Sequence, residues 1–157
     1  MSQPIFQVKN LVKEFTVGGG FGKEAIFRAL HGVSFDLHAG KTLALVGESG
    51  CGKSTCARLM TKVYAPTEGE ILFNGREIST LKSRKDILDY RSRVQMIFQD
   101  PFGSLNPTHT IEHHLTRPLK IHKQVATKQA LTERLKELLT LVELPIETLA
   151  KYPHELS

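Results

Sequence analysis

The sequence reads Gly47-Glu48-Ser49-Gly50-Cys51-Gly52-Lys53-Ser54 at the point that decides its fold. This stretch fits the pattern G-x-x-x-x-G-K-[ST], in which glycines let backbone N–H groups turn toward a phosphate and the lysine reaches the phosphate oxygens. A chance match in a chain of 157 residues is expected well under about 1% of the time. The pattern therefore predicts a phosphate-binding loop.

The segments on either side of this loop supply the context that the pattern requires. Thr42 to Val46 is an apolar run that reads as a buried strand, and Lys53 to Val63 carries apolar residues at helical spacing. The N–H groups and partial positive charge at the start of that helix would favour an anion. We expect Lys53 to reach the β- and γ-phosphates, Ser54 to ligate Mg²⁺ and Thr55 to support the α-phosphate side. The alternative is a glycine-rich helix cap, which needs neither three glycines nor a lysine followed by a hydroxyl.

The residues before the loop predict a β region. Ile5 to Val8 alternates and reads as an edge strand leading to Phe15, and a flexible glycine loop is expected over residues 18–22. Ala29 to Leu37 alternates again, and His38-Ala39-Gly40 makes a turn into the apolar run before the phosphate loop. We expect a hairpin whose second strand is buried.

The residues after the loop predict two further strands with a helix between them. Ile71 to Gly75 reads as a strand that ends in an Asn-Gly tight turn. Ser79 to Tyr90 reads as a helix with Ser79 or Thr80 as its N-cap. Val94 to Phe98 is a short apolar strand, which would join the strand before the phosphate loop in a parallel sheet.

From Pro107 onward the pattern becomes helical. Lys128 to Leu144 carries a single apolar stripe bounded by lysine and glutamate, which predicts a helix packed in a helical subdomain. The stripe consists of Leu131, Leu135, Leu138, Leu139 and Val142.

Composition excludes several classes of protein. Apolar content of 40% and charged content of 24% are those of an ordinary globular chain. The net charge of +5 is spread along the sequence, so solvated helix faces are favoured over a nucleic-acid surface. No apolar run approaches the roughly 20 residues that span a bilayer, and Met1-Ser2-Gln3-Pro4 does not begin a secretory signal. Cys51 and Cys56 lack the spacing of a zinc site or disulfide framework.

The loop and a second motif together resemble the ATP-binding cassette (ABC) ATPases. Residues 46–55 are similar to the Walker A segment of that family, and Met96-Ile97-Phe98-Gln99-Asp100-Pro101 is similar to its Q-loop. The resemblance implies a P-loop NTPase α/β fold with an antiparallel β subdomain, a partial parallel core sheet and a helical subdomain. It implies ATP and Mg²⁺ as ligands of residues 47–55, with Gln99 a second contact to Mg²⁺ and the attacking water.

The resemblance becomes narrower in the segment that follows the Q-loop. Residues 100–107, Asp-Pro-Phe-Gly-Ser-Leu-Asn-Pro, are similar to the segment typical of oligopeptide and dipeptide importer ATPases, a group that includes nickel and glutathione relatives. Phe15 matches the aromatic that stacks on adenine in the family, although a lone Phe at a strand end is equally often core. The segment from Tyr152 to Ser157 resembles the lead-in to the family's signature loop.

The resemblance covers the whole chain but only the first part of the family's domain. We therefore expect a single, incomplete domain over residues 1–157, with a β subdomain and P-loop core over 1–99 and a Q-loop and helical subdomain over 100–157. No carboxylate matches the catalytic base, so this chain should bind ATP weakly and hydrolyse it negligibly. Open apolar sheet edges predict aggregation or a molten state.

The resemblance also implies partners and a location. It implies transmembrane permease subunits, a second ATP-binding subunit, and a peripheral position on the cytoplasmic face of the plasma membrane, with no nucleic acid. One alternative is a truncated remnant that binds nucleotide at most or has no function. Another is a soluble ABC protein of translation or DNA repair, which residues 100–107 disfavour. The sequence does not identify the transported solute.

One cluster of residues resembles a metal site by spacing alone. His109 and His113 stand four residues apart and His114 follows, but their order is not that of a His-Glu-x-x-His zinc site. We interpret them as surface histidines.

Overall fold

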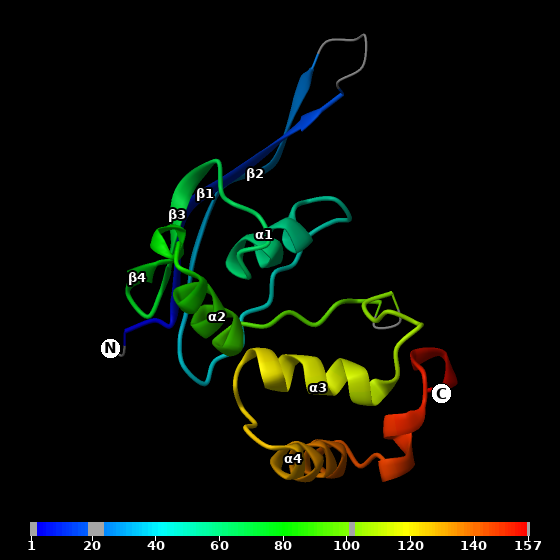
Figure 1. Cartoon of the computed structure of the whole chain (residues 1–157). Helices are drawn as coiled ribbons and strands as arrows, with labels where there is room; N and C mark the ends of the chain where they lie inside the picture. The colour runs from blue at the N-terminus through cyan, green and yellow to red at the C-terminus, as the bar shows by residue number, and fades with distance from the viewer. Residues whose placement is uncertain (1–2, 19–23, 101–102, 157) are drawn as a thin grey trace. The chain divides into compact units, whose positions relative to one another are not determined.

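The computed structural model describes residues 3–18, 24–100 and 103–156. Contacts divide the chain into two compact units, Met1–Met96 and Ile97–Ser157, and each is described by itself (Figure 1). Most of the expected glycine loop lies outside the described residues. Within the described ranges no helix is long and apolar enough to cross a membrane.

The first unit is built on one antiparallel sheet. Its strands are β1 (Phe6–Val17), β2 (Ala25–Leu37), β3 (Glu68–Phe73) and β4 (Arg76–Glu77), in the order β2-β1-β3-β4. The prediction that the first strand lies at an edge was wrong, because β1 pairs with β2 on one side and with β3 on the other. A strand's own pattern does not reveal how many neighbours it has.

The turn between β3 and β4 confirms the Asn-Gly prediction. Asn74 has φ 49° and Gly75 has φ 77°, so both central residues have the positive φ that a type I′ turn requires. The turn reverses the chain so that Phe73 pairs with Arg76.

The two apolar runs expected to form a parallel sheet are not strands. Residues 42–46 and 94–98 have no regular secondary structure, and Val46 and Ile97 are 88% and 96% exposed. The sheet of the described residues is wholly antiparallel. An apolar run becomes a strand only where neighbours satisfy its N–H and C=O groups, and no other described segment pairs with these runs. The predicted hairpin between β2 and residues 42–46 is therefore also wrong.

Helices α1 (Lys53–Met60) and α2 (Arg84–Arg93) complete the first unit. The helix predicted from Lys53 is confirmed, with Leu59 fully buried beside Leu11, Val8 and Ile71 of the sheet core. Apolar groups removed from water in this core supply the main drive for folding.

The start of the second predicted helix was wrong. A short 3₁₀ helix, η1 (Ile78–Thr80), comes first, and the N-cap of α2 is Ser83 in place of Ser79 or Thr80. The Thr80 hydroxyl is already occupied because it donates to the Glu77 carbonyl at 2.6 Å. The Ser83 hydroxyl accepts from the Asp86 N–H at 3.0 Å and donates to the Asp86 carboxylate at 2.7 Å.

The second unit is helical, as predicted. It contains α3 (Ile111–Ile121), α4 (Lys128–Leu141) and the 3₁₀ helices η2 (Ile146–Ala150) and η3 (Pro153–Glu155). Leu135 and Leu139 of the predicted stripe are buried, but Val142 is 61% exposed because α4 ends before it.

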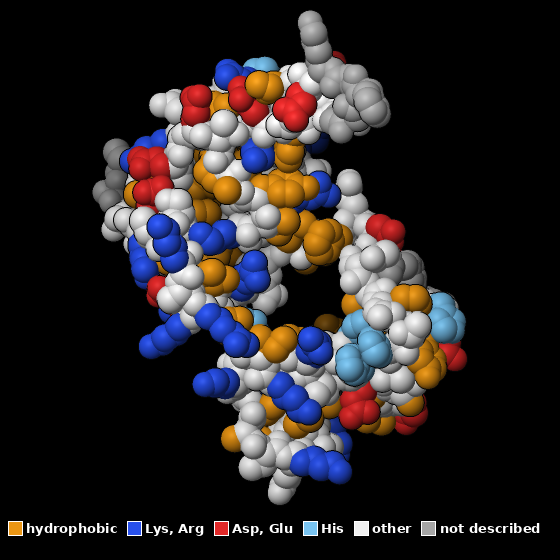
Figure 2. All heavy atoms as spheres, turned by 45° about the horizontal axis from the view of Figure 1, so that its top comes forward, with side chains coloured by type: hydrophobic (Ala, Val, Ile, Leu, Met, Phe, Trp, Pro, Cys, Tyr) orange, Lys and Arg blue, Asp and Glu red, His pale blue; other side chains and the backbone are white. Residues whose placement is uncertain are grey.

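Apolar side chains are also distributed over the molecular surface. On the face in Figure 2, hydrophobic side chains occur among lysine, arginine and acidic ones. The interpretation of the scattered charges as solvated helix faces stays a prediction.

The Ser83 cap predicts a pH-dependent contribution to stability. The hydrogen bond from Ser83, and then Arg76, lowers the pKa of Asp86. A lowered folded-state pKa gives stability that is present above the unfolded-state value and is lost as pH falls through the folded-state value. We expect Ser83→Ala to lower the free energy of unfolding by about 1 kcal/mol at neutral pH, less in acid, and to raise the Asp86 pKa in an NMR titration.

Ser92→Ala is the matched control, because Ser92 bonds only the Asp89 carbonyl near the other end of α2. An Asp86 pKa that stays unchanged in Ser83→Ala would contradict this account of the cap.

Candidate functional site

The glycine-rich loop leads directly into α1. Its glycines at 50 and 52 have φ values of 83° and 94°, in the left-handed region that a Cβ disfavours. The Cys51 N–H donates to the Glu48 carbonyl at 3.3 Å, which closes a turn at the loop's tip. The loop therefore has the tight turn, with positive φ at its glycines, that the sequence predicts.

Lys53 lies inside the turn of this loop. Its ammonium Nζ donates to the carbonyls of Gly47 at 2.7 Å and Glu48 at 2.6 Å, and contacts Cys51 Sγ at 3.3 Å. These contacts hold the Lys53 ammonium group close to the backbone of the first two residues of the loop. The contact with Cys51 was not predicted. The sequence indicates it only in that Cys51 and Lys53 stand two residues apart.

The N-terminus of α1 differs from those of the other α-helices. In the described chain, α2, α3 and α4 each have a Ser or Thr side chain that accepts a hydrogen bond from an N-terminal N–H. The N-cap of α1 is Gly52, which offers no side chain, and its first turn contains no acidic residue. The first N–H groups of a helix have no intrahelical partner, so α1 presents free donors and a positive dipole end beside Lys53.

The hydroxyl residues of the loop lie in the first turn of α1. Ser54 is exposed and Thr55 is half-buried. Among the described residues no group of three or more His, Cys, Asp or Glu side chains is placed to hold a metal. Mg²⁺ often binds through one or two protein ligands together with phosphate oxygens and water. The exposed Ser54 hydroxyl fits that requirement.

Phe15 lies in β1 and is half-buried. Its ring meets Tyr64 edge-on with centroids 5.4 Å apart, and the Lys13 ammonium lies 5.0 Å from its centroid. Neither neighbour was predicted, although Lys13 stands two residues before Phe15 and so points to the same side of the strand. Adenine stacking on Phe15 stays a prediction.

Gln99 is exposed and belongs to the second unit. The loop lies in the first unit, so the role of Gln99 beside Mg²⁺ also stays a prediction. The expected strand that leads to it is not formed.

His109, His113 and His114 of the second unit lie close together without the geometry of a metal site. The rings of His109 and His113 are stacked, with centroids 4.0 Å apart and planes 16° apart, so their in-plane lone pairs do not converge on one ion. Burial, followed by the nearby charges of His109 and His114, lowers the pKa of His113.

Comparison with known proteins identifies the family. The sequence profile of the family described as "ABC transporter" matches residues 30–157, and the chain belongs to this family. Membership implies nucleotide binding. The fold is that of the ABC ATPase cassettes, a small α/β domain.

Particular relatives agree with this assignment. The chain is 43% identical over 157 residues to the oligopeptide transport ATP-binding protein OppF of Bacillus subtilis (strain 168), covering 100% of this chain and 50% of that protein. It is 40% identical to the dipeptide transport ATP-binding protein DppF of Escherichia coli (strain K12), covering 100% and 47%. The chain thus spans about half the length of the curated relatives it matches.

Solved structures of cassettes are similar as well. The dimeric MJ0796 bacterial ABC transporter cassette matches with a TM-score of 0.80 and 27% identity, over 97% of this chain and 63% of that one. The same cassette bound to ADP and Pi in a post-hydrolysis state matches with a TM-score of 0.77 and 26% identity.

The glycine loop predicts unequal effects of two alanine substitutions. A Cβ at Gly52 would lie 2.5 Å from the Ala29 carbonyl oxygen and 2.6 Å from Leu30 Cδ2, whereas a Cβ at Gly50 would meet no atom within 4 Å. Both residues have positive φ, which costs a Cβ-bearing residue roughly 1–2 kcal/mol. We expect Gly50→Ala to lower the free energy of unfolding by about that amount and Gly52→Ala by clearly more, as measured by urea unfolding.

If Gly50→Ala and Gly52→Ala lowered the free energy of unfolding equally, the close approach of Gly52 to β2 would not constrain the loop.

Proposed function

We propose that this chain binds ATP with Mg²⁺ at residues 47–55. The observation that carries the proposal is the uncapped N-terminus of α1, which lies directly beside the Lys53 ammonium. Both features favour a bound polyphosphate, since each offers positive charge or N–H donors to an anion. In this proposal Lys53 exchanges its carbonyl contacts for β- and γ-phosphate oxygens.

The remaining loop residues take supporting roles. Residues 47–52 supply backbone N–H groups to the β-phosphate, Ser54 ligates Mg²⁺ and Thr55 supports the α-phosphate side. Phe15 stacks on adenine, and Gln99 contacts Mg²⁺ and the attacking water. These two assignments rest on the family resemblance, while the loop assignments also rest on the contacts of Lys53.

The relatives support a role in transport. We propose that the chain belongs to the energy-coupling subunit of an ABC importer for peptides or related small solutes, where ATP hydrolysis drives transport. Its partners would be transmembrane permease subunits and a second ATP-binding subunit, at the cytoplasmic face of the plasma membrane. The identities to OppF and DppF support this proposal, as does the peptide-importer segment that follows Gln99.

Nucleotide binding is tested by two substitutions in the loop. We expect Lys53→Ala to weaken ATP binding between tenfold and a hundredfold, the effect of about 1.5–3 kcal/mol for hydrogen bonds to a charged group. In the absence of Mg²⁺, Ser54→Ala should bind ATP with the affinity of the unsubstituted chain. It should lose most of the increase in ATP affinity that Mg²⁺ gives to the unsubstituted chain. Isothermal titration calorimetry with and without Mg²⁺ measures both effects.

Lys136→Ala is the matched control, because it removes the same charge from an exposed position on α4. An unchanged affinity in Lys53→Ala would overturn the proposed site. Phosphate release by the unsubstituted 157-residue polypeptide should remain at background, since none of its carboxylates matches a catalytic base motif.

The transport role is tested in cells that carry the gene. Deleting the gene should abolish ATP-dependent uptake of radiolabelled short peptides, and the intact gene should restore it. The same gene with Lys53→Ala should fail to restore uptake, whereas Lys136→Ala should restore it fully. Peptide uptake that survives the deletion would contradict the importer role while leaving nucleotide binding untouched.

A further inference from the structure

A cavity lies in the first unit, among α2, β3, β4 and η1. It has a volume of about 240 Å³. The apolar part of its lining is largely buried: Ile78 is 4% exposed, Leu81 7% and Tyr90 2%, while Phe73 is half-buried. Phe73 and Tyr90 meet edge-on with centroids 5.3 Å apart. The inner lining of the cavity is therefore apolar and partly aromatic.

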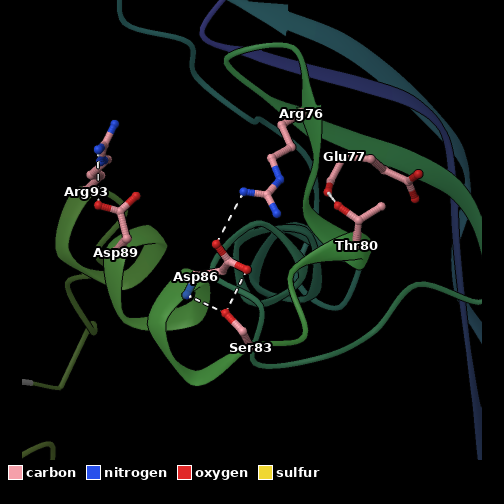
Figure 3. Close-up of polar contacts among 7 residues, drawn as sticks. All are labelled: Arg76, Glu77, Thr80, Ser83, Asp86, Asp89 and Arg93. Atoms are coloured by element: carbon pink, nitrogen blue, oxygen red, sulfur yellow. Dashed lines mark hydrogen bonds and ion pairs between the residues drawn. The ribbon is translucent and has the colours of Figure 1, made fainter.

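The outer part of the lining is charged, with two cations and two anions. Arg76 Nη1 lies 3.4 Å from Asp86 Oδ1, and Arg93 Nη2 lies 3.1 Å from Asp89 Oδ1 (Figure 3). Asp86, Asp89 and Arg93 stand at i, i+3 and i+7 of α2, so they share one face of that helix. Arg76 comes from β4, immediately after the Asn-Gly turn.

These ion pairs are able to exchange partners. Each is a single contact in place of a bidentate one, and the four side chains are between 36% and 59% exposed. Exposed pairs of this kind contribute little to stability. A ligand that replaces both halves of one pair therefore displaces the existing contact at small cost.

The balance of charge selects the kind of ligand. A simple anion would engage an arginine and leave its aspartate without that cation, and a simple cation would do the reverse. A zwitterion inserted between Arg93 and Asp89 gives its carboxylate to the arginine and its ammonium to the aspartate while the Arg76–Asp86 pair stays in place, so every charge keeps a partner. An apolar side chain on the zwitterion would occupy the inner lining, where it leaves water.

The volume limits the size of the ligand. Because one water in the liquid occupies about 30 Å³, the cavity has room for about eight waters, below the range of roughly 300–1,000 Å³ typical of drug-sized ligands. One amino acid with a branched or aromatic side chain is of this size. We propose that the cavity is a binding site for a free α-amino acid with an apolar side chain, separate from the nucleotide loop.

Tyr90 connects this cavity to the helix that carries the loop. Tyr90 is one of the lining residues, and its hydroxyl donates to the carbonyl of Met60, the last residue of α1. An occupant that contacts Tyr90 restricts it, and through this hydrogen bond it restricts the C-terminal end of α1. The cavity is thus placed to influence nucleotide binding as well as to hold its own ligand.

The binding site is tested with L-leucine as the probe on the complete 157-residue chain. We expect saturable shifts of the backbone NMR signals of α2 and β4. N-acetyl-leucine lacks the ammonium, leucinamide lacks the carboxylate and glycine lacks the side chain, so each should bind at least tenfold more weakly than leucine. Glycine binding as well as leucine, or leucine producing no saturable shift up to its solubility limit, would overturn the proposal.

Variants locate the site on the protein. Arg93→Gln should weaken leucine binding at least tenfold, because it removes the partner of the ligand's carboxylate. Asp89→Asn should weaken it as much, because it removes the partner of the ligand's ammonium. If one variant unfolds, the other still tests the site. Arg134→Gln is the matched control, because Arg134 makes a similar exposed pair with Glu137 at 2.8 Å on α4. Leucine binding that is unaffected by both Arg93→Gln and Asp89→Asn would overturn the site.

The proposed link between the cavity and α1 is tested separately, by measuring ATP affinity with and without leucine. Tyr90→Phe keeps the ring but loses the bond to Met60, so it should still bind leucine while leucine no longer changes ATP affinity. Arg93→Gln should bind ATP normally in the absence of leucine, which keeps a failure of this site distinct from a failure of the nucleotide loop. Equal ATP affinity with and without leucine in the unsubstituted chain would overturn the connection.

Discussion

The close approach of Gly52 to β2 is the constraint on which the phosphate loop depends. No side chain fits at this residue, because the Ala29 carbonyl oxygen and Leu30 occupy the space. The loop therefore ends against a strand that is itself paired along β1. Lys53, the next residue, is the first of α1. Its position is therefore determined more by the sheet than by the flexibility of the loop.

The same constraint explains why α1 lacks a cap. A Ser, Thr, Asn or Asp at the N-cap contributes about 1 kcal/mol to helix stability, and the other three α-helices of the described chain have one. At α1 the cap position is the one where a side chain would collide with β2. The N–H groups left open in this way are the donors that an anion needs. The loss of a cap is offset by the burial of Cys56 and Leu59, which stand at i+4 and i+7 from Gly52 and so share its face of the helix.

Features of the fold that depend on neighbouring residues could be predicted from the sequence. The helix after Lys53, the Asn74-Gly75 turn and the helical second unit all rest on spacing or on turn chemistry within a few residues. Strand pairing depends on distant residues, so the runs 42–46 and 94–98 looked like strands although no neighbour pairs with them. The central place of β1 was missed for the same reason. The cap of α2 was missed because several hydroxyls stand close together, and only the structure shows that Thr80 already bonds Glu77.

The two proposed sites of the first unit differ in how far the sequence could reveal them, because one is continuous in the chain and the other is not. The loop places Lys53 and the N–H groups at the start of α1 in one continuous segment, so a motif can encode it. The cavity balances two arginines against two aspartates that come from β4 and α2. In sequence those charges look like a solvated helix face, because opposite charges three and four residues apart are common on exposed helices. A site that selects by charge balance becomes visible only when the fold brings its opposite charges to one apolar cavity.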